Sequence, residues 1–340
     1  MLRLPKFDIE RPSSLAAATT LLEEHGDDAM LLAGGTDLVP NMKHELFTPR
    51  VVVSLADIPE LFGIRTGDDG ALVIGAMTTL DELASHPDVV QRAPALAQAA
   101  SLVAGPQLRS MGTLGGNVML DTRCQWYNQT HFWRQALGFC LKKDGTACHV
   151  VAGGSRCVAA ASNDTAPVLM TLDAELAFHG PAGSHKVLTK DLWHSDGIYN
   201  KKIQGEILTE VHIPSTPPGH RGAYGKLRER GSIDFPLFGV AVRLDLDAEE
   251  RIESAALAAV ALQARPVALK RAAKILTGVP SGDRERLERA AREAGELAGR
   301  QCRPLENVPG DADWRHAMVP VYVRRTILAA AASDGPVHHI

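Results

Sequence analysis

The sequence predicts an α+β fold that ends in an antiparallel sheet with helices. The first half of the chain contains short strand-like runs and two glycine-rich turns. Neither of these two turns has the G-x-G-x-x-G spacing of a doubly wound dinucleotide-binding fold. Later in the chain, three strand-like runs follow one another and helical patterns complete the sequence. We therefore expect strands and helices to be segregated in the last part of the chain.

Composition limits the class of protein. With 340 residues, 45% of them apolar, the chain is long enough for two or three domains. The formal net charge of −4 provides no basic field that would attract nucleic acid. The uncharged apolar runs are far shorter than the ~18 residues of a membrane span, and the N-terminal residues lack a signal-peptide pattern. We expect a cytoplasmic protein that binds neither nucleic acid nor membranes.

Caps and glycines define the elements of the first hundred residues. Ser14 caps a predicted helix over 15–25, and Gly26 ends it. Thr79 and Glu82 have the spacing of a capping box, which predicts a short helix there. The remaining elements expected in this region are strands at 29–33, 51–55 and 72–75 and an apolar helix at 94–104.

The rest of the chain divides at an insertion and a linker. Residues 121–158 fit neither helical nor strand periodicity, and the prolines and glycine of 214–219 mark a linker. Strands are expected at 169–178, 206–213, 224–230, 238–246 and 251–262, the last three as a meander. The last of them is rich in alanine, so a helix is its alternative. Helices are expected at 266–276, 283–298 and 313–332.

Two glycine-rich turns are candidate binding loops for an anionic ligand. Glycines allow backbone N–H groups to approach a diphosphate, and successive N–H groups form an anion-binding turn. For one loop alone, an ordinary tight turn is the better interpretation. Two such loops in one domain favour a dinucleotide, although neither matches the Walker pattern. The loop residues are Leu31, Leu32, Ala33, Gly34, Gly35, Thr36 and Asp37, and then Thr113, Leu114, Gly115, Gly116 and Asn117.

Four of the five cysteines fall within the insertion, at Cys124, Cys140, Cys148 and Cys157. Disulfides are disfavoured because they are rare in the reducing cytosol. Structural zinc sites usually contain closely spaced C-x2-4-C pairs, which are absent here. Wide spacing among aromatic residues suits a [4Fe–4S] cluster, because four thiolates hold it and apolar bulk tunes its potential. Spacing alone leaves the cluster and zinc open; Cys302, far downstream, is expected to be an ordinary thiol.

Four short motifs are spread along the chain: Ala-Gly-Gly-Thr-Asp-Leu at 33–38, Gly-Ala-Met-Thr-Thr-Leu at 75–80, Thr-Leu-Gly-Gly-Asn at 113–117 and Tyr-Gly-Lys-Leu-Arg at 224–228. In kind and order they resemble those of the FAD-binding subunits of the molybdenum hydroxylases, and the similarity runs essentially end to end. Most members of that family lack the insertion. Its cysteines resemble those of the β subunit of 4-hydroxybenzoyl-CoA reductases, where the insertion carries a [4Fe–4S] cluster.

This resemblance implies a domain organisation. A two-lobed FAD-binding domain of the PCMH-like type would take 1–56 as its first lobe and 57–216 as its second. The second lobe would contain the iron–sulfur insertion 121–158. A C-terminal flavoprotein domain would occupy 220–340.

The resemblance also implies residue roles. The two glycine loops would wrap the FAD diphosphate and ribityl chain, and Asp164 would hydrogen-bond the flavin. Leu208 and Lys226 would line the ring, where a cation stabilises the anionic reduced form. Val103 stands where xanthine enzymes carry an aromatic residue, so adenine stacking there stays open. The four clustered cysteines would ligate the [4Fe–4S] cluster.

The function implied is electron transfer within a larger oxidoreductase. The partners would be a large molybdenum-cofactor subunit and a small subunit with two [2Fe–2S] centres, in a heterohexamer. Reduced ferredoxin would supply electrons for removing the phenolic hydroxyl of 4-hydroxybenzoyl-CoA, so this chain would hold no residue that reacts with substrate. Two alternatives remain: the flavin subunit of an aldehyde or N-heterocycle hydroxylase, and a zinc-stabilised binding subunit without a redox role.

Overall fold

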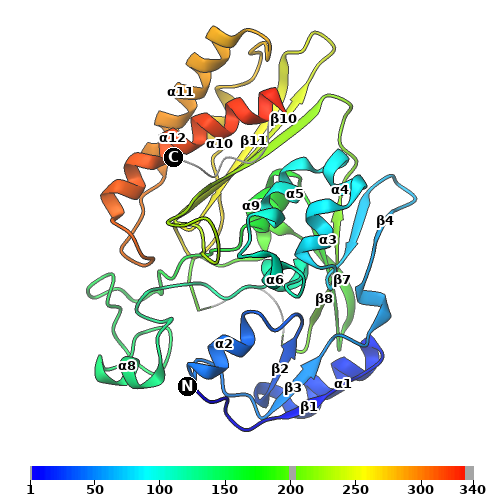
Figure 1. Ribbon diagram of the computed structural model, residues 1–340, viewed down its shortest axis with the longest axis vertical. Coiled ribbons are helices and arrows are strands. Elements are labelled where there is room, and N and C mark those ends of the chain that lie inside the picture. The colour runs from blue at the N-terminus through cyan, green and yellow to red at the C-terminus, as the bar shows by residue number, and fades with distance from the viewer. Residues whose placement is uncertain (1, 199–203, 334–340) are drawn as a thin grey trace.

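Three separate sheets organise the residues that the computed structural model describes, 2–198 and 204–333 (Figure 1). A three-stranded sheet has the order β1-β3-β2, a five-stranded sheet the order β4-β5-β8-β6-β7, and a four-stranded sheet the order β12-β11-β10-β9. The predicted α+β class is confirmed. None of the helices in the described ranges combines the length and the apolar character that crossing a bilayer demands.

The three-stranded sheet is parallel, and its crossover is the first predicted helix. Its strands are β1 (Asp8–Glu10), β2 (Ala29–Leu32) and β3 (Val51–Ser54). Between β1 and β2 runs α1 (Leu15–His25), with the Ser14 hydroxyl accepting from the Ala17 N–H at 3.2 Å. Gly26 ends the helix with a φ of 52°, as the sequence predicts. The first glycine loop follows β2 and leads into α2 (Leu38–Lys43).

The five-stranded sheet is antiparallel. Its strands are β4 (Ile64–Thr66), β5 (Leu72–Gly75), β6 (Glu175–Gly180), β7 (Gly183–Leu188) and β8 (Ile207–Ile213). Its connections contain α3 (Leu80–Ser85), α4 (Pro87–Arg92), α5 (Pro94–Ser101), α6 (Pro106–Arg109), α7 (Leu114–Val118) and α9 (Thr165–Thr171). Thr79 caps α3 as predicted, since its hydroxyl accepts from the Glu82 N–H at 3.2 Å, which is one of the two hydrogen bonds of a capping box.

One predicted strand in this region is partly wrong. The sequence predicts a strand over 169–178, but α9 continues to Thr171 and β6 begins only at Glu175. A turn at Asp173, with a φ of 51°, separates the two elements. The residues of α9 are almost all buried, so their apolar run has no exposed side to show a period.

The C-terminal sheet is the predicted meander. It consists of β9 (His220–Leu227), β10 (Phe238–Leu246), β11 (Ile252–Val260) and the short β12 (Val267–Ala268). The alanine-rich segment is therefore a strand, because it pairs with a neighbour on both edges. Three helices pack with the sheet: α10 (Lys270–Lys274), α11 (Arg284–Gln301) and α12 (Ala312–Ala332). The first is much shorter than the helix expected over 266–276.

A buried carboxylate joins two strands of this sheet. Asp245 on β10 accepts from the Nδ1 of His220 at 3.0 Å and from the Arg243 Nε and Ser254 hydroxyl at 2.9 and 2.7 Å. Burial alone would raise the pKa of Asp245, but these hydrogen bonds outweigh it and hold that pKa at about 2. The carboxylate is therefore charged across the neutral range.

The insertion is hydrogen-bonded to an N-terminal segment at Glu45 and to a C-terminal segment at Asn307. Its one helix within the described residues, α8 (His131–Ala136), escaped the sequence prediction. The buried Arg134 on that helix donates to the Glu45 carbonyl at 2.9 Å, next to the first glycine loop and α2. At its other side, the Gln125 N–H donates to the Asn307 carbonyl, and the Asn307 amide donates to the Val158 carbonyl. The insertion therefore packs as part of the molecule, with α2 as its neighbour (Figure 1).

Candidate cofactor sites

A cavity of about 830 Å³ is lined by residues from both glycine loops, from β8 and from the 233–235 segment. Ligand sites in proteins usually have volumes of about 300–1,000 Å³. Most of the predicted flavin residues line it. They are Leu31, Ala33, Gly34, Gly35, Thr36, Asp37, Val103, Thr113, Gly115, Gly116, Asn117, Asp164 and Leu208.

Three predicted flavin residues are not among the lining residues. Leu32 is the last residue of β2, and Leu114 is fully buried in the core. Lys226 is fully buried as well, behind Asp164. These three residues would therefore affect the flavin cavity only indirectly, through the neighbouring residues that line it.

The first glycine loop offers unpaired donors. Across the described residues, the N–H groups of Gly34, Gly35, Thr36 and Asp37 donate to no other group of the chain. Gly35 has a φ of 72°, which permits the sharp turn. A β-carbon at Gly34 would lie 1.7 Å from the carbonyl oxygen of Met111, so glycine there lets the two loops touch. Consecutive free N–H groups beside a cavity are suited to bind an anion.

The second loop contributes in a different way. Apart from that of Thr113, its N–H groups are already satisfied: Leu114 donates to Thr78, Gly115 to Ala76, Gly116 to the Thr113 hydroxyl and Asn117 to the Thr113 carbonyl. Of the two loops, only the first therefore presents a run of successive free N–H groups. A β-carbon at Gly115 would meet Ala76 at 2.8 Å, so packing within the chain explains that glycine.

No close packing contact within the chain accounts for a glycine at position 116. A β-carbon there would meet only the Thr113 hydroxyl at 3.1 Å and the Ala33 β-carbon at 3.9 Å. The residue is exposed and borders the cavity. The missing side chain therefore leaves space that a bound molecule can use.

Asp164 lies at the cavity wall in a fixed orientation. One carboxylate oxygen accepts from the Tyr224 hydroxyl at 2.8 Å and the other from the Lys226 Nζ at 3.1 Å. The Nζ also donates to the Leu102 and Asp234 carbonyls, at 2.9 and 3.2 Å. Burial raises the pKa of Asp164, and the nearby ammonium of Lys226 opposes that shift. The sequence indicated Asp164 and Lys226 but gave no reason to pair them.

Sequence reasoning missed the far wall of the cavity. Ile233 and Phe235 line it, yet their side chains are 60% and 46% exposed. They lie on the loop after β9, which is held by the ion pair between Arg228 and Asp234. Exposed apolar side chains at a cavity mouth are typical of ligand sites. In the sequence, the one feature that could have identified Ile233 and Phe235 as site residues is their apolar character within a charged segment.

The four clustered cysteines line one second, much smaller cavity of about 20 Å³. Cys124, Cys140 and Cys157 are buried there with Leu46 and Tyr127, and Cys148 is half-buried. Burial, with a smaller contribution from the neighbouring thiols, raises the pKa of Cys124 to about 11. Binding of a metal would therefore release protons. All five cysteines are free thiols.

The four cysteines around this cavity are donors of the type that a thiolate-bound metal requires. The volume of the cavity is close to that of a single water, so the walls would move apart to admit a cluster. No group of three His, Cys, Asp or Glu side chains in the described part of the chain already stands in metal-binding geometry. His149 also lines this cavity, with its Nε2 in contact with the Phe139 carbonyl at 2.6 Å, whereas Cys302 lies in the C-terminal core.

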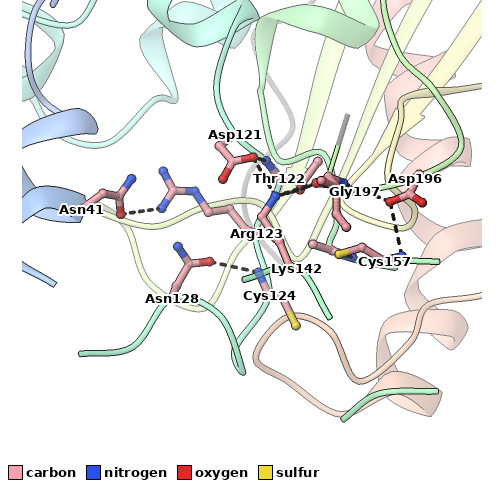
Figure 2. A network of polar contacts seen from close by, with 12 residues as sticks. Asn41, Asp121, Thr122, Arg123, Cys124, Asn128, Lys142, Cys157, Asp196 and Gly197 are labelled. Atoms are coloured by element: carbon pink, nitrogen blue, oxygen red, sulfur yellow. Dashed lines mark hydrogen bonds and ion pairs between the residues drawn. The ribbon is translucent and has the colours of Figure 1, made fainter. Parts of the chain in front are cut away.

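Buried polar contacts surround the cysteines (Figure 2). The Lys142 Nζ donates to Asp121 and Thr122 at 2.7 Å and to the Gly197 carbonyl at 2.5 Å. Gly197 packs so closely that a β-carbon there would come within 2.9 Å of the Cys157 sulfur. These contacts hold the insertion against the 196–197 segment.

The comparisons with known proteins agree with this geometry. A family model described as the FAD binding domain in molybdopterin dehydrogenase matches residues 5–216. A second, described as the CO dehydrogenase flavoprotein C-terminal domain, matches residues 223–330. The carbon monoxide dehydrogenase medium chain of Afipia carboxidovorans is 32% identical over 96% of this chain and 97% of its own length. The aldehyde oxidoreductase FAD-binding subunit of Escherichia coli is 32% identical over 72% of this chain and 80% of its own.

Solved structures extend the similarity to the whole fold. Carbon monoxide dehydrogenase from Hydrogenophaga pseudoflava matches 98% of this chain and 100% of its own with a TM-score of 0.78 at 28% identity. Quinoline 2-oxidoreductase from Pseudomonas putida matches 97% and 99% with a TM-score of 0.76 at 26% identity. Fold and cavity thus define a flavoprotein. The chain belongs to the FAD-binding medium subunits of the molybdenum hydroxylase family.

Proposed function

We propose that this chain is the FAD- and [4Fe–4S]-carrying subunit of a molybdenum-containing 4-hydroxybenzoyl-CoA reductase. In this role it passes electrons from reduced ferredoxin toward a molybdenum subunit. There, two electrons and two protons replace the phenolic hydroxyl with hydrogen, giving benzoyl-CoA and water. The chemistry on the substrate belongs to the partner, so this chain needs no residue that touches it.

The observation that supports this proposal is the gathering of four cysteines in an insertion beside the flavin cavity. Cys124, Cys140, Cys148 and Cys157 line one cavity and form no disulfide. An aromatic and aliphatic shell that includes Leu46, Tyr127 and Trp126 surrounds them, which would limit access of water. Four thiolates in an apolar pocket are the usual ligands of a [4Fe–4S] cluster, which supplies one-electron chemistry.

The residues of the flavin cavity would bind and orient FAD. The free N–H groups from Gly34 to Asp37 would donate to the diphosphate oxygens, and Gly116 would leave room for the cofactor. Tyr224 and Lys226 would keep the Asp164 carboxylate turned to receive a hydrogen bond from the flavin. Bound FAD exchanges electrons in steps of one or two, which suits a link between one-electron centres.

The partners follow from the family. We propose a large subunit with the molybdenum cofactor and a small subunit with two [2Fe–2S] centres, assembled as a heterohexamer. Support comes from two relatives, at 32% and 29% identity, that are named as the medium chain of carbon monoxide dehydrogenase and the medium subunit of nicotine 6-hydroxylase.

The test is the activity of the complex that co-purifies with this chain under anaerobic conditions. We expect 4-hydroxybenzoyl-CoA to be converted to benzoyl-CoA with reduced ferredoxin. Oxidation of an aldehyde or an N-heterocycle with a dye acceptor, and no reductive activity, would instead identify a hydroxylase subunit. Aldehydes and N-heterocycles are chosen as the comparison substrates because two relatives are named as subunits of an aldehyde oxidoreductase and a nicotine 6-hydroxylase.

A zinc-stabilised subunit is the second candidate, favoured by one observation. A cavity of about 20 Å³ is closer to the needs of a single ion than to those of a four-iron cluster. Iron, sulfide and zinc analysis of the anaerobically purified chain separates the two. Zinc in place of iron would leave the proposed flavin binding unaffected, but the chain would then have no cluster to receive electrons from ferredoxin.

A further inference from the structure

Arg123 belongs to both candidate cofactor sites. It immediately precedes Cys124, and it also lines the flavin cavity. Among the described residues that line this cavity, it is the single lysine or arginine, whereas six are aspartate or glutamate. The residue is 8% exposed. Its buried cation is therefore placed where an anionic cofactor binds.

The side chain of Arg123 joins three parts of the cavity wall. Its guanidinium forms an ion pair with Asp37 of the first glycine loop and donates to the Asn41 Oδ1 of α2 at 3.4 Å. The same group lies over the Phe235 ring at 4.5 Å from its centre. Figure 2 shows the side chain extending toward Asn41, away from the sulfur of Cys124.

The backbone of Arg123 belongs to the cysteine site. Its N–H donates to the Ala160 carbonyl and its carbonyl accepts from the Ala160 N–H, both at 2.7 Å. This pairing ties the segment before Cys124 to the segment that follows Cys157. A displacement of either cysteine would consequently move the guanidinium.

Asp37 shows why the guanidinium matters for the flavin. Its carboxylate lies in the loop whose free N–H groups face the cavity, and its side chain is 34% exposed. Without Arg123, this carboxylate would keep only the neutral Asn41 amide, which donates to it at 3.1 Å, and its charge would face the site for a diphosphate without a cation. Like charges in a partly buried site repel strongly because water screens them poorly.

We propose that Arg123 is a positioning residue of the flavin site, supplied by the cysteine insertion. It neutralises and fixes Asp37, and through its backbone it makes FAD affinity depend on an intact cysteine site. The second part rests on the proposed function, in which the cysteines hold a cluster. The first part concerns FAD alone.

The experiment is a titration of the deflavinated full-length chain with FAD, followed by quenching of flavin fluorescence. Arg123→Gln should weaken binding on the order of 10-fold, within the ~5- to 150-fold range of couplings between sites. Arg156→Gln is the matched control, because Arg156 also directly precedes a cysteine but is exposed and outside the cavity. It should bind FAD as the unsubstituted chain does.

Removing the charge of Asp37 distinguishes electrostatics from a general loss of structure. The double variant Asp37→Asn with Arg123→Gln should recover most of the lost affinity for FAD. If Arg123→Gln alone does not fold, the FAD affinity of the double variant is measured in its place. Unchanged FAD affinity in Arg123→Gln, or no recovery in the double variant, would overturn the role of Arg123.

A double-mutant cycle tests the link between the sites. Cys157→Ala should weaken FAD binding in the unsubstituted chain and have little further effect beside Arg123→Gln. Equal effects in both backgrounds, or none in the first, would overturn the coupling. Iron analysis of the same preparations decides separately whether the cysteines hold a cluster, so a failure of the proposed function would be recognised as such.

Discussion

Replacement of Gly116 by alanine should separate flavin binding from folding. The added β-carbon meets the Thr113 hydroxyl at 3.1 Å and otherwise only the Ala33 β-carbon at 3.9 Å. Alanine is favoured over glycine inside a helix by about 0.8–1.0 kcal/mol, and the contact with the capping threonine offsets part of this. The free energy of unfolding of the flavin-free chain should thus change by less than about 1 kcal/mol.

The effect on FAD should be much larger. The methyl group would occupy the space that Gly116 leaves at the cavity, so we expect affinity for FAD to fall at least tenfold, and Gly116→Val to retain little flavin. The assay is FAD titration together with denaturant unfolding of the flavin-free proteins, since bound ligand by itself stabilises a fold.

Gly115→Ala is the contrasting variant. Its β-carbon would lie 2.8 Å from Ala76, so it should destabilise the chain even without flavin. Full FAD affinity in Gly116→Ala would refute the assignment of this surface to the cofactor. A loss of stability as large as that of Gly115→Ala would refute the reasoning from open space.

Three further predictions concern buried charges and thiols. Lys226→Met should lower the free energy of unfolding of the flavin-free chain at neutral pH by about 3–5 kcal/mol, because it leaves the Asp164 carboxylate buried without its cation. Denaturant titration measures this free energy, and a decrease of less than about 1 kcal/mol would contradict the prediction. The pKa of Asp245, held at about 2, lies below its unfolded value, so stability from this group is present above about pH 4 and is lost as pH falls toward 2. Asp245→Asn should remove about 2–3 kcal/mol of that acid dependence, and an unchanged pH profile would count against the pairing. Cys148→Ala should lose iron while Cys302→Ala keeps it, by metal analysis; equal iron in both would exclude Cys148 as a ligand.

Features governed by neighbouring residues could be predicted from the sequence. The ends of α1 and the start of α3 follow from the serine and threonine caps and from Gly26, all within a few residues of the helices. The meander of β9 to β11 follows from three consecutive strand patterns in the sequence. The division of 165–180 into helix and strand was not visible, because burial on all sides removes the periodic pattern.

The candidate sites show the same limit. The gathering of four cysteines in one cavity was predictable, since all lie within one segment. The contacts that set the chemistry were not, because they join distant residues: Tyr224 reaches Asp164 over 60 positions, and Arg123 reaches Asn41 over 82. Likewise, only the folded chain shows that Gly115 serves packing while Gly116 borders the cavity.

A reductive titration of the anaerobically purified complex is the most direct test of inward electron flow. We predict a [4Fe–4S] signal and a flavin signal from this chain, with the cluster well below the flavin in potential. A gap of ~200 mV would correspond to about 4–5 kcal/mol for each electron, at 59 mV per tenfold. Cluster type alone does not set this, since [4Fe–4S] potentials span roughly −700 to +450 mV. A cluster that titrates above the flavin, or zinc with no cluster signal, would contradict the proposed role of this chain as the point where electrons enter.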